Sequence, residues 1–432
     1  MLRCGFGLKD APRLWNKVLR ALLEDIGMRP LQSDEQLFVW HETTGRSDAP
    51  NSSKASDTEV FAPTLRMILS THVDDMKGAG QPEYKKRLLL ALEKKFGQLK
   101  LKEANFECVG VMHESSADGH DVWTHQQHYV GQIKAIPIGG RTFAKDDEAA
   151  DDDMKQLYMS LVGALAWLVL TIPAICIYVA ALQRHTQAPT LKHVKDANRL
   201  LEWIRKNLKQ LGIRFKQLAE PLRLVCLSDS AFKAQEFEGL VMRGCVIFLA
   251  SATPAGRSGV STDSQGCKPW TTGTDVQVQL LDWYSKKHTR VVRSTYAAEL
   301  LSLLDAVNQG HVLKLCLHEV ICGAQPAAKL INTKKLAIPL DAGVDARSVF
   351  DSATAQQVRT PADKQLILHV RALREHLDEG LIDVFYWIDT EDMLPDGMTK
   401  GSIDRKPLLA LANDGVWSIR HDDPVYKVLK AE

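Results

Sequence analysis

Four acidic residues in the second half of the chain stand where strands and helices are expected to begin or end. Asp229 ends an apolar strand pattern, Glu299 falls in the first turns of a long helix pattern, and Asp345 separates a strand from a helix. Asp396 follows the last strand pattern. Carboxylate oxygens are ligands that Mg²⁺ prefers. Two such ions about 3.5–4 Å apart can activate a water and stabilise the leaving oxygen of a phosphodiester. The pattern therefore indicates a candidate metal-dependent hydrolytic site.

Glu299 is the most informative of the four acids. At helical spacing its neighbours are Leu303, Ala306 and Gly310, so the carboxylate belongs to an otherwise apolar stripe. A carboxylate aimed at a core is costly unless it is paired or binds a metal. Taken alone, each acid also fits a turn or a helix cap. The prediction therefore depends on all four converging at one edge of a sheet.

A second acidic pair, Asp74 and Asp75, lies in the first half of the chain. It follows an apolar run at 65–73 and precedes a turn containing Gly78 and Gly80. This order predicts a strand–turn–strand hairpin. From the residues alone, the pair fits either an exposed loop or one half of a metal site.

Periodicity predicts the elements that must position these acids. The first half should contain an amphipathic helix whose apolar face is Leu14, Val18, Leu22 and Leu23. This helix is expected over 8–26. A strand at 37–41, a flexible loop over 42–63 and a basic helix with its exit over 82–102 should follow.

The second half has more strand patterns, followed by alternating helices and strands. Strands are expected at 222–230, 239–250, 280–287, 335–340 and 381–388, and helices at 294–320, 346–357 and 361–378, with a Gly/Ser/Thr-rich insertion at 251–275. Such an order predicts an α/β (α+β) domain built on a mixed sheet.

The uncharged segment 156–183 is long enough to cross a bilayer. It contains several polar residues and Pro173, which favours two buried helices broken before the proline. An acidic run at 145–155 precedes it and is expected to be a solvated linker. A basic helix is predicted over 191–210.

Composition bounds the partners and the compartment. With 432 residues the chain should form two or three domains, and its net charge of +1 gives no global attraction for nucleic acid. A nucleic-acid partner would need local basic faces, although a solvated surface fits them equally. Eight cysteines without a CxxC pair argue against zinc and indicate reduced thiols. With no signal-peptide core, an intracellular location, cytoplasmic or nuclear, is expected. The candidate basic residues are Lys192, Lys195, Arg199, Lys206, Lys209, Lys286, Lys287, Arg290 and Arg293.

Seven segments occur in a fixed order over residues 5–401. They are GFGLKDAPRLWNKVL, HVDDM, YMSLVGALAWLVLTIPAICIYVAAL, LSDSAF, WYSKKHTRVVRSTYAAEL, VDARSVFDSA and WIDTEDMLPDGMTKG. In this order they resemble the C-terminal part of the Pol polyprotein of Ty1/copia-type retrotransposons, a reverse transcriptase followed by a ribonuclease H. Any one segment is weak; seven in order are a specific signal.

The resemblance implies a domain plan. A partial polymerase palm would occupy 1–142, an acidic linker with thumb- or connection-like helices 143–218, a ribonuclease H-like domain 219–405, and a tail 406–432. In the family, the segment corresponding to 156–183 belongs to a soluble region, so the membrane span becomes a minor alternative.

The resemblance also assigns roles. Asp229, Glu299, Asp345 and Asp396 would hold two Mg²⁺ ions, with Mn²⁺ as the alternative, and cut the RNA strand of an RNA–DNA hybrid. No small-molecule cofactor is implied. Asp74 and Asp75 would be metal ligands of the polymerase hairpin. Adjacent strand residues point to opposite faces, so Asp74 is expected to be the main ligand.

Departures from the family pattern affect the polymerase half. The fingers and the first catalytic aspartate are expected to be missing, His72 replaces a tyrosine, and Asp10 replaces a glutamine. An inactive polymerase is therefore expected. A non-catalytic remnant with at most nucleic-acid binding stays open as the alternative.

Overall fold

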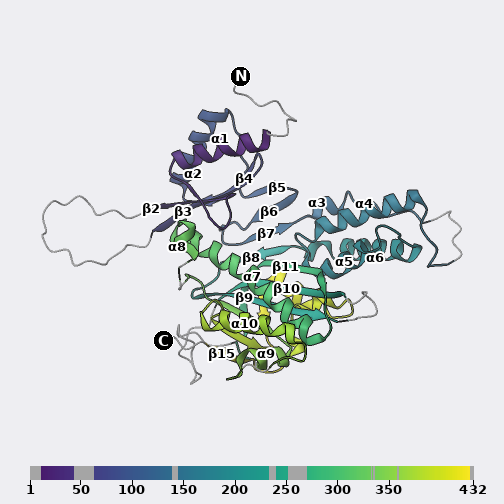
Figure 1. The fold of residues 1–432 in the computed structure, drawn as a ribbon. Helices are drawn as coiled ribbons and strands as arrows, with labels where there is room; N and C mark the ends of the chain where they lie inside the picture. The colour runs from purple at the N-terminus through teal and green to yellow at the C-terminus, as the bar shows by residue number, and fades with distance from the viewer. Residues whose placement is uncertain are drawn as a thin grey trace. The chain divides into compact units, whose positions relative to one another are not determined.

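The structure is a computed structural model with a mixed α/β fold and three sheets among the described residues (Figure 1). Contacts divide the chain into two compact units, Met1–Glu103 with Val312–Ile338, and Ala104–His311 with Pro339–Glu432. The domain plan expected from the sequence stays a prediction. The described residues are 11–42, 63–138, 145–232, 240–251, 270–331, 333, 336–357 and 360–428.

The first unit contains a four-stranded antiparallel sheet in the order β1-β2-β3-β4. The expected hairpin is confirmed, because β3 and β4 pair with His72 opposite Asp75. The basic helix α2 ends at Phe96, where Gly97 adopts a positive φ of 92°, and residues 97–102 form the expected exit from the helix. The elements of this unit are α1 (Ala11–Asp25), β1 (Arg29–Pro30), β2 (Leu37–Glu42), β3 (Thr64–His72), β4 (Asp75–Gly80), α2 (Pro82–Phe96) and α8 (Ala327–Ile331).

The buried face of α1 matches the expected one in part, because Leu22 and Leu23 pack in the core as predicted. Leu14 and Val18 are exposed, whereas Leu19 and Leu23 are buried. The apolar stripe that packs on the sheet includes Trp15 and Ile26, at spacings of three and four residues from these leucines. A helix with apolar residues on two faces buries only the one that meets the sheet. Positions 8–10 of the predicted helix, and the predicted loop over 43–62, lie outside the described residues.

The second unit begins with a small antiparallel sheet, β5-β6-β7-β8, and a group of helices. The segment 156–183 forms two helices, α4 and α5, that are separated by a turn at Pro173, as the sequence predicts. Tyr158, Leu165 and Leu201 are buried where α4 and α6 pack. The bounds are β5 (Asn105–Cys108), β6 (Val111–Ser115), β7 (Val122–His125), α3 (Gln127–Val130), α4 (Asp152–Leu168), η1 (Pro173–Ile175), α5 (Cys176–Gln183), α6 (Leu191–Asn207), η2 (Leu208–Gln210) and β8 (Ile213–Phe215).

No helix in the described part of the chain combines the length and the apolar character that a membrane crossing needs.

The acidic run at 145–155 is only in part a linker. Residues 145–149 are exposed and outside helices. The later residues of the run form the start of α4. The Asp151 carboxylate accepts a hydrogen bond from the Met154 backbone N–H at 2.8 Å. This is an N-cap, and acids in the first turn of a helix are also favoured by its dipole.

A seven-stranded mixed sheet, ordered β14-β11-β10-β9-β12-β13-β15, dominates the second unit. β10 is antiparallel to both of its neighbours, β9 and β11, whereas β12 is parallel to both β9 and β13. The mixed sheet expected for this half of the chain is confirmed. Its strands are β9 (Leu222–Ala231), β10 (Leu240–Ser251), β11 (Asp275–Val291), β12 (Leu340–Val344), β13 (Val384–Trp387), β14 (Val416–Ser418) and β15 (Val425–Val428).

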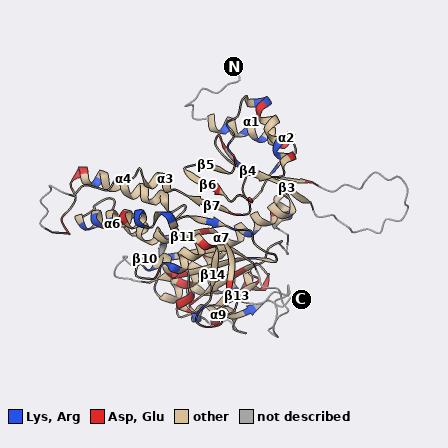
Figure 2. Cartoon of the chain, turned by 180° about the vertical axis from the view of Figure 1, so that it is seen from behind, with Lys and Arg blue, Asp and Glu red and all other residues tan. Residues whose placement is uncertain are grey.

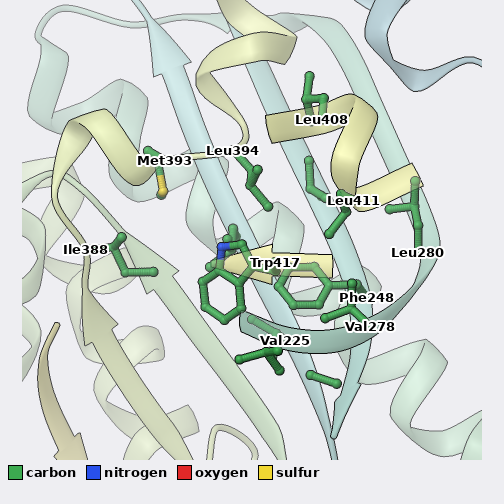
Figure 3. Packing of buried hydrophobic residues seen from close by; sticks show 14 of the residues in the cluster. Val225, Phe248, Val278, Leu280, Ile388, Met393, Leu394, Leu408, Leu411 and Trp417 are labelled. Atoms are coloured by element: carbon green, nitrogen blue, oxygen red, sulfur yellow. The ribbon is translucent and has the colours of Figure 1, made fainter. Parts of the chain in front are cut away.

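Hydrophobic clusters cover both faces of this sheet. On β13, Val384 and Tyr386 belong to one cluster and Phe385 to the other, because successive strand residues point to opposite faces. The first cluster is centred on Trp417, whose ring contacts Phe248 edge-to-face at 5.1 Å (Figure 3). The helices of this sheet are α7 (Thr295–Cys322), α9 (Arg347–Thr354), η3 (Lys364–Leu366), α10 (Ile367–Asp378), η4 (Thr390–Asp392), α11 (Asp396–Thr399), α12 (Lys406–Leu409) and η5 (Ala410–Asp414).

The strand expected at 335–340 is displaced. β12 instead covers Leu340–Val344 and begins directly after Pro339. A proline has no backbone N–H, and β12 pairs on both sides, so the strand cannot include it as a central residue. The apolar residues Leu336 and Ile338 are buried before the strand starts.

A buried ion pair joins the first strand of the sheet to β12. The Arg223 guanidinium donates to both carboxylate oxygens of Asp341, with Nε at 2.7 Å from Oδ2. Arg223 is 2% exposed and Asp341 is fully buried. A buried bidentate pair of this kind is costly to break on one side, because the remaining charge loses its compensation.

Replacing one partner should therefore destabilise the sheet. We expect Asp341→Leu to lower the free energy of unfolding by about 3–5 kcal/mol. Urea unfolding of the full chain, followed by circular dichroism, measures this. The matched double variant Arg223→Leu/Asp341→Leu should be more stable than Asp341→Leu alone. If the double variant is less stable than Asp341→Leu, the unpaired Arg223 guanidinium is not what destabilises the single variant.

Candidate metal centre

Three of the four predicted acids meet at one edge of the mixed sheet. Carboxylate oxygens of Asp229, Asp345 and Asp396 all lie within 4.8 Å of one another. Asp229 is on β9 and Asp345 directly follows β12, which is the parallel neighbour of β9. Parallel neighbours end at the same edge, which brings these two side chains together. No other set of three His, Cys, Asp or Glu residues meets this distance in the part of the chain that is described.

A glycine lets the third acid reach the first. Gly244 on β10 pairs with Asp229 on β9. A Cβ atom on Gly244 would lie 2.6 Å from Cβ of Met398 and 2.9 Å from the carbonyl oxygen of Pro395. The short helix α11 can therefore lie directly against β10 because this position has no side chain. Asp396, the first residue of α11, is thereby placed beside Asp229.

Glu299 lies beside this group without joining it. Glu299 is 7% exposed and lies in the second turn of α7. Its expected neighbours Leu303, Ala306 and Gly310 are buried. Burial, and then the charges of Asp229 and Asp345, raise the pKa of the Glu299 carboxyl to about 9. The Oε2 atom has no hydrogen-bond partner. An unpartnered, buried carboxylate oxygen next to other carboxylates fits an additional metal ligand.

Lys400 and Thr399 complete the site, and the sequence interpretation did not include them. The Lys400 ammonium lies 2.6 Å from Oδ1 of Asp396 and 3.8 Å from Oδ1 of Asp229. Burial opposes the charge on Lys400, but the neighbouring carboxylates raise its pKa overall, Asp229 most strongly. The Thr399 hydroxyl donates to Oδ2 of Asp229. The signal that could have found Lys400 is its position four residues after Asp396, one helical turn away.

Crowding changes the protonation of the aspartates. Burial, and then the charge of Asp396, raise the pKa of Asp229 to about 7. The same two causes raise the pKa of Asp345. A divalent cation would relieve this repulsion, and hard oxygen ligands suit Mg²⁺ and Mn²⁺. The donor set of the site therefore fits these ions.

Asp74 and Asp75 lie at the turn of the β3–β4 hairpin, and both are exposed. Val73, just before them, has a positive φ of 54°, and its carbonyl oxygen accepts a hydrogen bond from the Trp15 indole at 2.5 Å. A tight turn is therefore present. No third potential ligand joins the pair among the residues that are described, and their metal role stays a prediction.

The predicted basic residues fall into two groups. On α6, Lys195, Arg199 and Lys206 form ion pairs with Asp146, Asp196 and Glu202 at 2.6, 2.9 and 2.8 Å. Figure 2 shows acidic residues interspersed with basic ones along this helix. Lys286 and Lys287 are exposed on β11, Arg293 is exposed after it, and the side chain of Arg290 lies outside the described residues. The role of these residues in nucleic-acid binding stays a prediction; Lys192 and Lys209 complete the set.

Comparisons with known proteins add little to this geometry. No protein-family model and no curated protein matches the chain. Among the solved structures that match is LC11-RNase H1, isolated from compost by a metagenomic approach, which aligns over 42% of this chain and 96% of its own. The identity is 14% and the TM-score 0.24, too low to carry an argument about fold or activity. The interpretation depends on the residues themselves.

The raised pKa of Asp229 predicts how metal-free stability changes with pH. The folded state holds this proton more tightly than the unfolded state, where the pKa is near 3.8. The free energy of unfolding should therefore fall as pH rises from about 4 to about 7. One pKa unit corresponds to about 1.4 kcal/mol, so the loss should reach about 4 kcal/mol. In EDTA at pH 8, Asp229→Asn should melt at a higher temperature than the unmodified chain.

Two conditions serve as controls for this melting experiment. Near pH 4 the two proteins should melt at similar temperatures, because the aspartate is then protonated. At pH 8, Mg²⁺ should stabilise the unmodified chain more than Asp229→Asn. A variant that is less stable at pH 8 in EDTA would show that Asp229 is not destabilised by its neighbours.

The close approach at Gly244 gives a second prediction for this site. We expect Gly244→Ala to displace α11 and to reduce the stabilisation of the chain by Mg²⁺, because Asp396 would move away from Asp229. Thermal shift with and without Mg²⁺ measures this. Gly380→Ala is the control, since no atom lies within 4 Å of a Cβ at that position, although its φ of 73° carries local strain. An unchanged Mg²⁺ shift in Gly244→Ala would contradict the prediction.

Proposed function

We propose that this chain is a metal-dependent nuclease that hydrolyses the RNA strand of RNA–DNA hybrids, as the resemblance to the ribonuclease H of Ty1/copia-type Pol implies. The observation that carries the proposal is the cluster of Asp229, Asp345 and Asp396, two of them buried, with Glu299 beside it. The proposal assigns this activity to residues 219–405, which supply strands β9 to β13 of the mixed sheet.

Asp229, Asp345 and Asp396 would hold Mg²⁺ or Mn²⁺, and Glu299 would supply a further carboxylate. When bound, such ions activate a water and stabilise the leaving oxygen of a phosphodiester. Thr399 fixes the orientation of the Asp229 carboxylate by its hydrogen bond, and Lys400 does the same for Asp396. The products would be a 3′-hydroxyl and a 5′-phosphate. The hybrid would be selected through backbone shape and 2′-hydroxyl groups.

The first half of the chain would be a partial polymerase palm without polymerase activity. Asp74 and Asp75 are at an exposed hairpin turn, as metal ligands of such a palm would be. The third acid that a two-metal polymerase needs is not beside them in the described part of the chain. This half then contributes no chemistry of its own.

A non-catalytic remnant that binds nucleic acid is the second candidate. The observation that favours it is the Lys400 ammonium, which lies among the carboxylates and compensates part of their charge. The cluster can therefore remain folded as an ion-pair network without a metal. Hybrid cleavage separates the two candidates.

The test is cleavage of a labelled RNA–DNA hybrid by the full chain in Mg²⁺ or Mn²⁺. We expect cleavage of the RNA strand, and a loss of about a hundredfold or more in Asp229→Asn, because a metal ligand is removed. Asp404→Asn is the matched control, an exposed acid that follows the same site in sequence. Folded full-length protein that leaves the hybrid intact in both metals would instead support the non-catalytic candidate.

A further inference from the structure

A pocket of about 590 Å³ lies in the second unit, and the proposed cleavage does not use it. Residues of α5, residues of α6 and Arg405, just before α12, line it. Its volume falls within the range of sites that bind small organic groups. The question is which chemical group its lining would recognise.

The lining is basic. Lys192, Arg199 and Arg405 contribute three positive charges, and Asp196 contributes one negative charge. The Arg199 side chain is 73% exposed and pairs with Asp196 at 2.9 Å across one helical turn. An exposed ion pair of this kind is weak, so the guanidinium is available to a stronger anion such as a phosphate.

The lining also has flat rings. Trp203 is half-buried at the wall of the pocket. His185 and His193 stack on each other, with ring centroids 3.7 Å apart and planes 12° apart. The Thr190 backbone N–H donates to Nδ1 of His193 at 3.0 Å, so the proton of the neutral ring is on Nε2. Burial lowers the pKa of both histidines, which favours uncharged rings at neutral pH.

The pocket and the carboxylate cluster share one loop. Arg405 lines the pocket and donates to the carbonyl oxygens of Gly397 and Lys400, the latter at 2.8 Å. Tyr178, on the pocket wall, donates from its hydroxyl to the Gly401 carbonyl oxygen at 2.7 Å. The loop that follows α11 is therefore fixed from the pocket side. The segment that carries Asp396 and Lys400 is therefore held by two residues of the pocket wall.

We propose that this pocket binds one nucleotide of an unpaired DNA or RNA strand that extends from the cleaved hybrid, with the base against Trp203 and a phosphate on Lys192 and Arg199. Basic side chains beside aromatic rings are the combination that holds single strands without reading their sequence. Asp196 adds an acceptor for the donors of a base or a ribose. The inference rests on the proposed function for the hybrid, but single-strand binding can be measured independently of cleavage.

Fluorescence anisotropy of the full chain tests the inference, with Asp229→Asn as background to prevent cleavage. The probes are oligomers of about 12 nucleotides, one of deoxythymidine and one of uridine. Trp203→Ala should weaken binding of single strands by about 5- to 100-fold, the range for loss of one base stack. Trp203→Phe should restore most of it. The two probes show whether the pocket prefers DNA or RNA.

The charged wall has its own matched pair of variants. Arg199→Ala should weaken binding and reduce the slope of log affinity against log salt by about one, as expected for one lost phosphate contact. Lys134→Ala is the control, because it removes an exposed positive charge from the same unit, outside the pocket and outside the predicted nucleic-acid-binding residues. Equal losses for the two variants would show a diffuse basic face and overturn the inference.

The outcomes separate the pocket from the nuclease. Hybrid cleavage by the unmodified chain, together with single-strand binding that Trp203→Ala leaves unchanged, would overturn the pocket and leave the nuclease standing. Single-strand binding that depends on Trp203 and Arg199, in a chain that cuts no hybrid, would support the pocket and reject the nuclease. A hybrid with an unpaired extension should bind more tightly than a blunt one, and Trp203→Ala should remove that difference.

Discussion

Repulsion between buried carboxylates is the constraint on which the second unit depends. Asp229 and Asp396 are almost completely buried, and Asp345 lies beside them. When ionised, the three carboxylates repel one another. A protein interior weakly screens such charges, so some compensation must be built into the fold. Here part of it comes from Lys400, part from the hydroxyl of Thr399, and part from protonation of Asp229. A divalent cation would supply the remainder, which is the physical reason to interpret the cluster as a metal centre.

The backbone around the cluster is arranged so that this crowding is tolerated. Gly244 leaves room for α11 against β10, and without that contact Asp396 would lie elsewhere. The buried pair of Arg223 and Asp341 links β9 to β12, the two parallel strands whose ends place Asp229 and Asp345. One position without a side chain and one compensated charge pair thus support the elements that carry the three acids. Neither takes part in the proposed chemistry.

Two kinds of polar site occur along one loop. Beside α11, three aspartates form a mostly buried cluster, a combination that selects hard cations. Beyond the loop, Lys192, Arg199 and Trp203 line a basic and aromatic pocket, a combination that selects nucleotides. Arg405 connects them, since it lines the pocket and holds the carbonyl oxygens of Gly397 and Lys400. If both proposals hold, the pocket would take the unpaired strand that extends from the hybrid.

The sequence by itself determined the local elements and the identity of the acids. Strand and helix periods depend on neighbouring residues, so the hairpin at 65–80, the two helices divided by Pro173 and the apolar stripe below Glu299 were all predictable. Tertiary structure decided what local patterns do not contain. Packing chose Leu19 rather than Leu14 for the buried face of α1, and the two-sided pairing of β12 moved its start past Pro339. The role of Gly244, the ammonium of Lys400 among the aspartates and the pocket on α6 all depend on contacts between segments far apart in the chain, and no period in the sequence records those contacts.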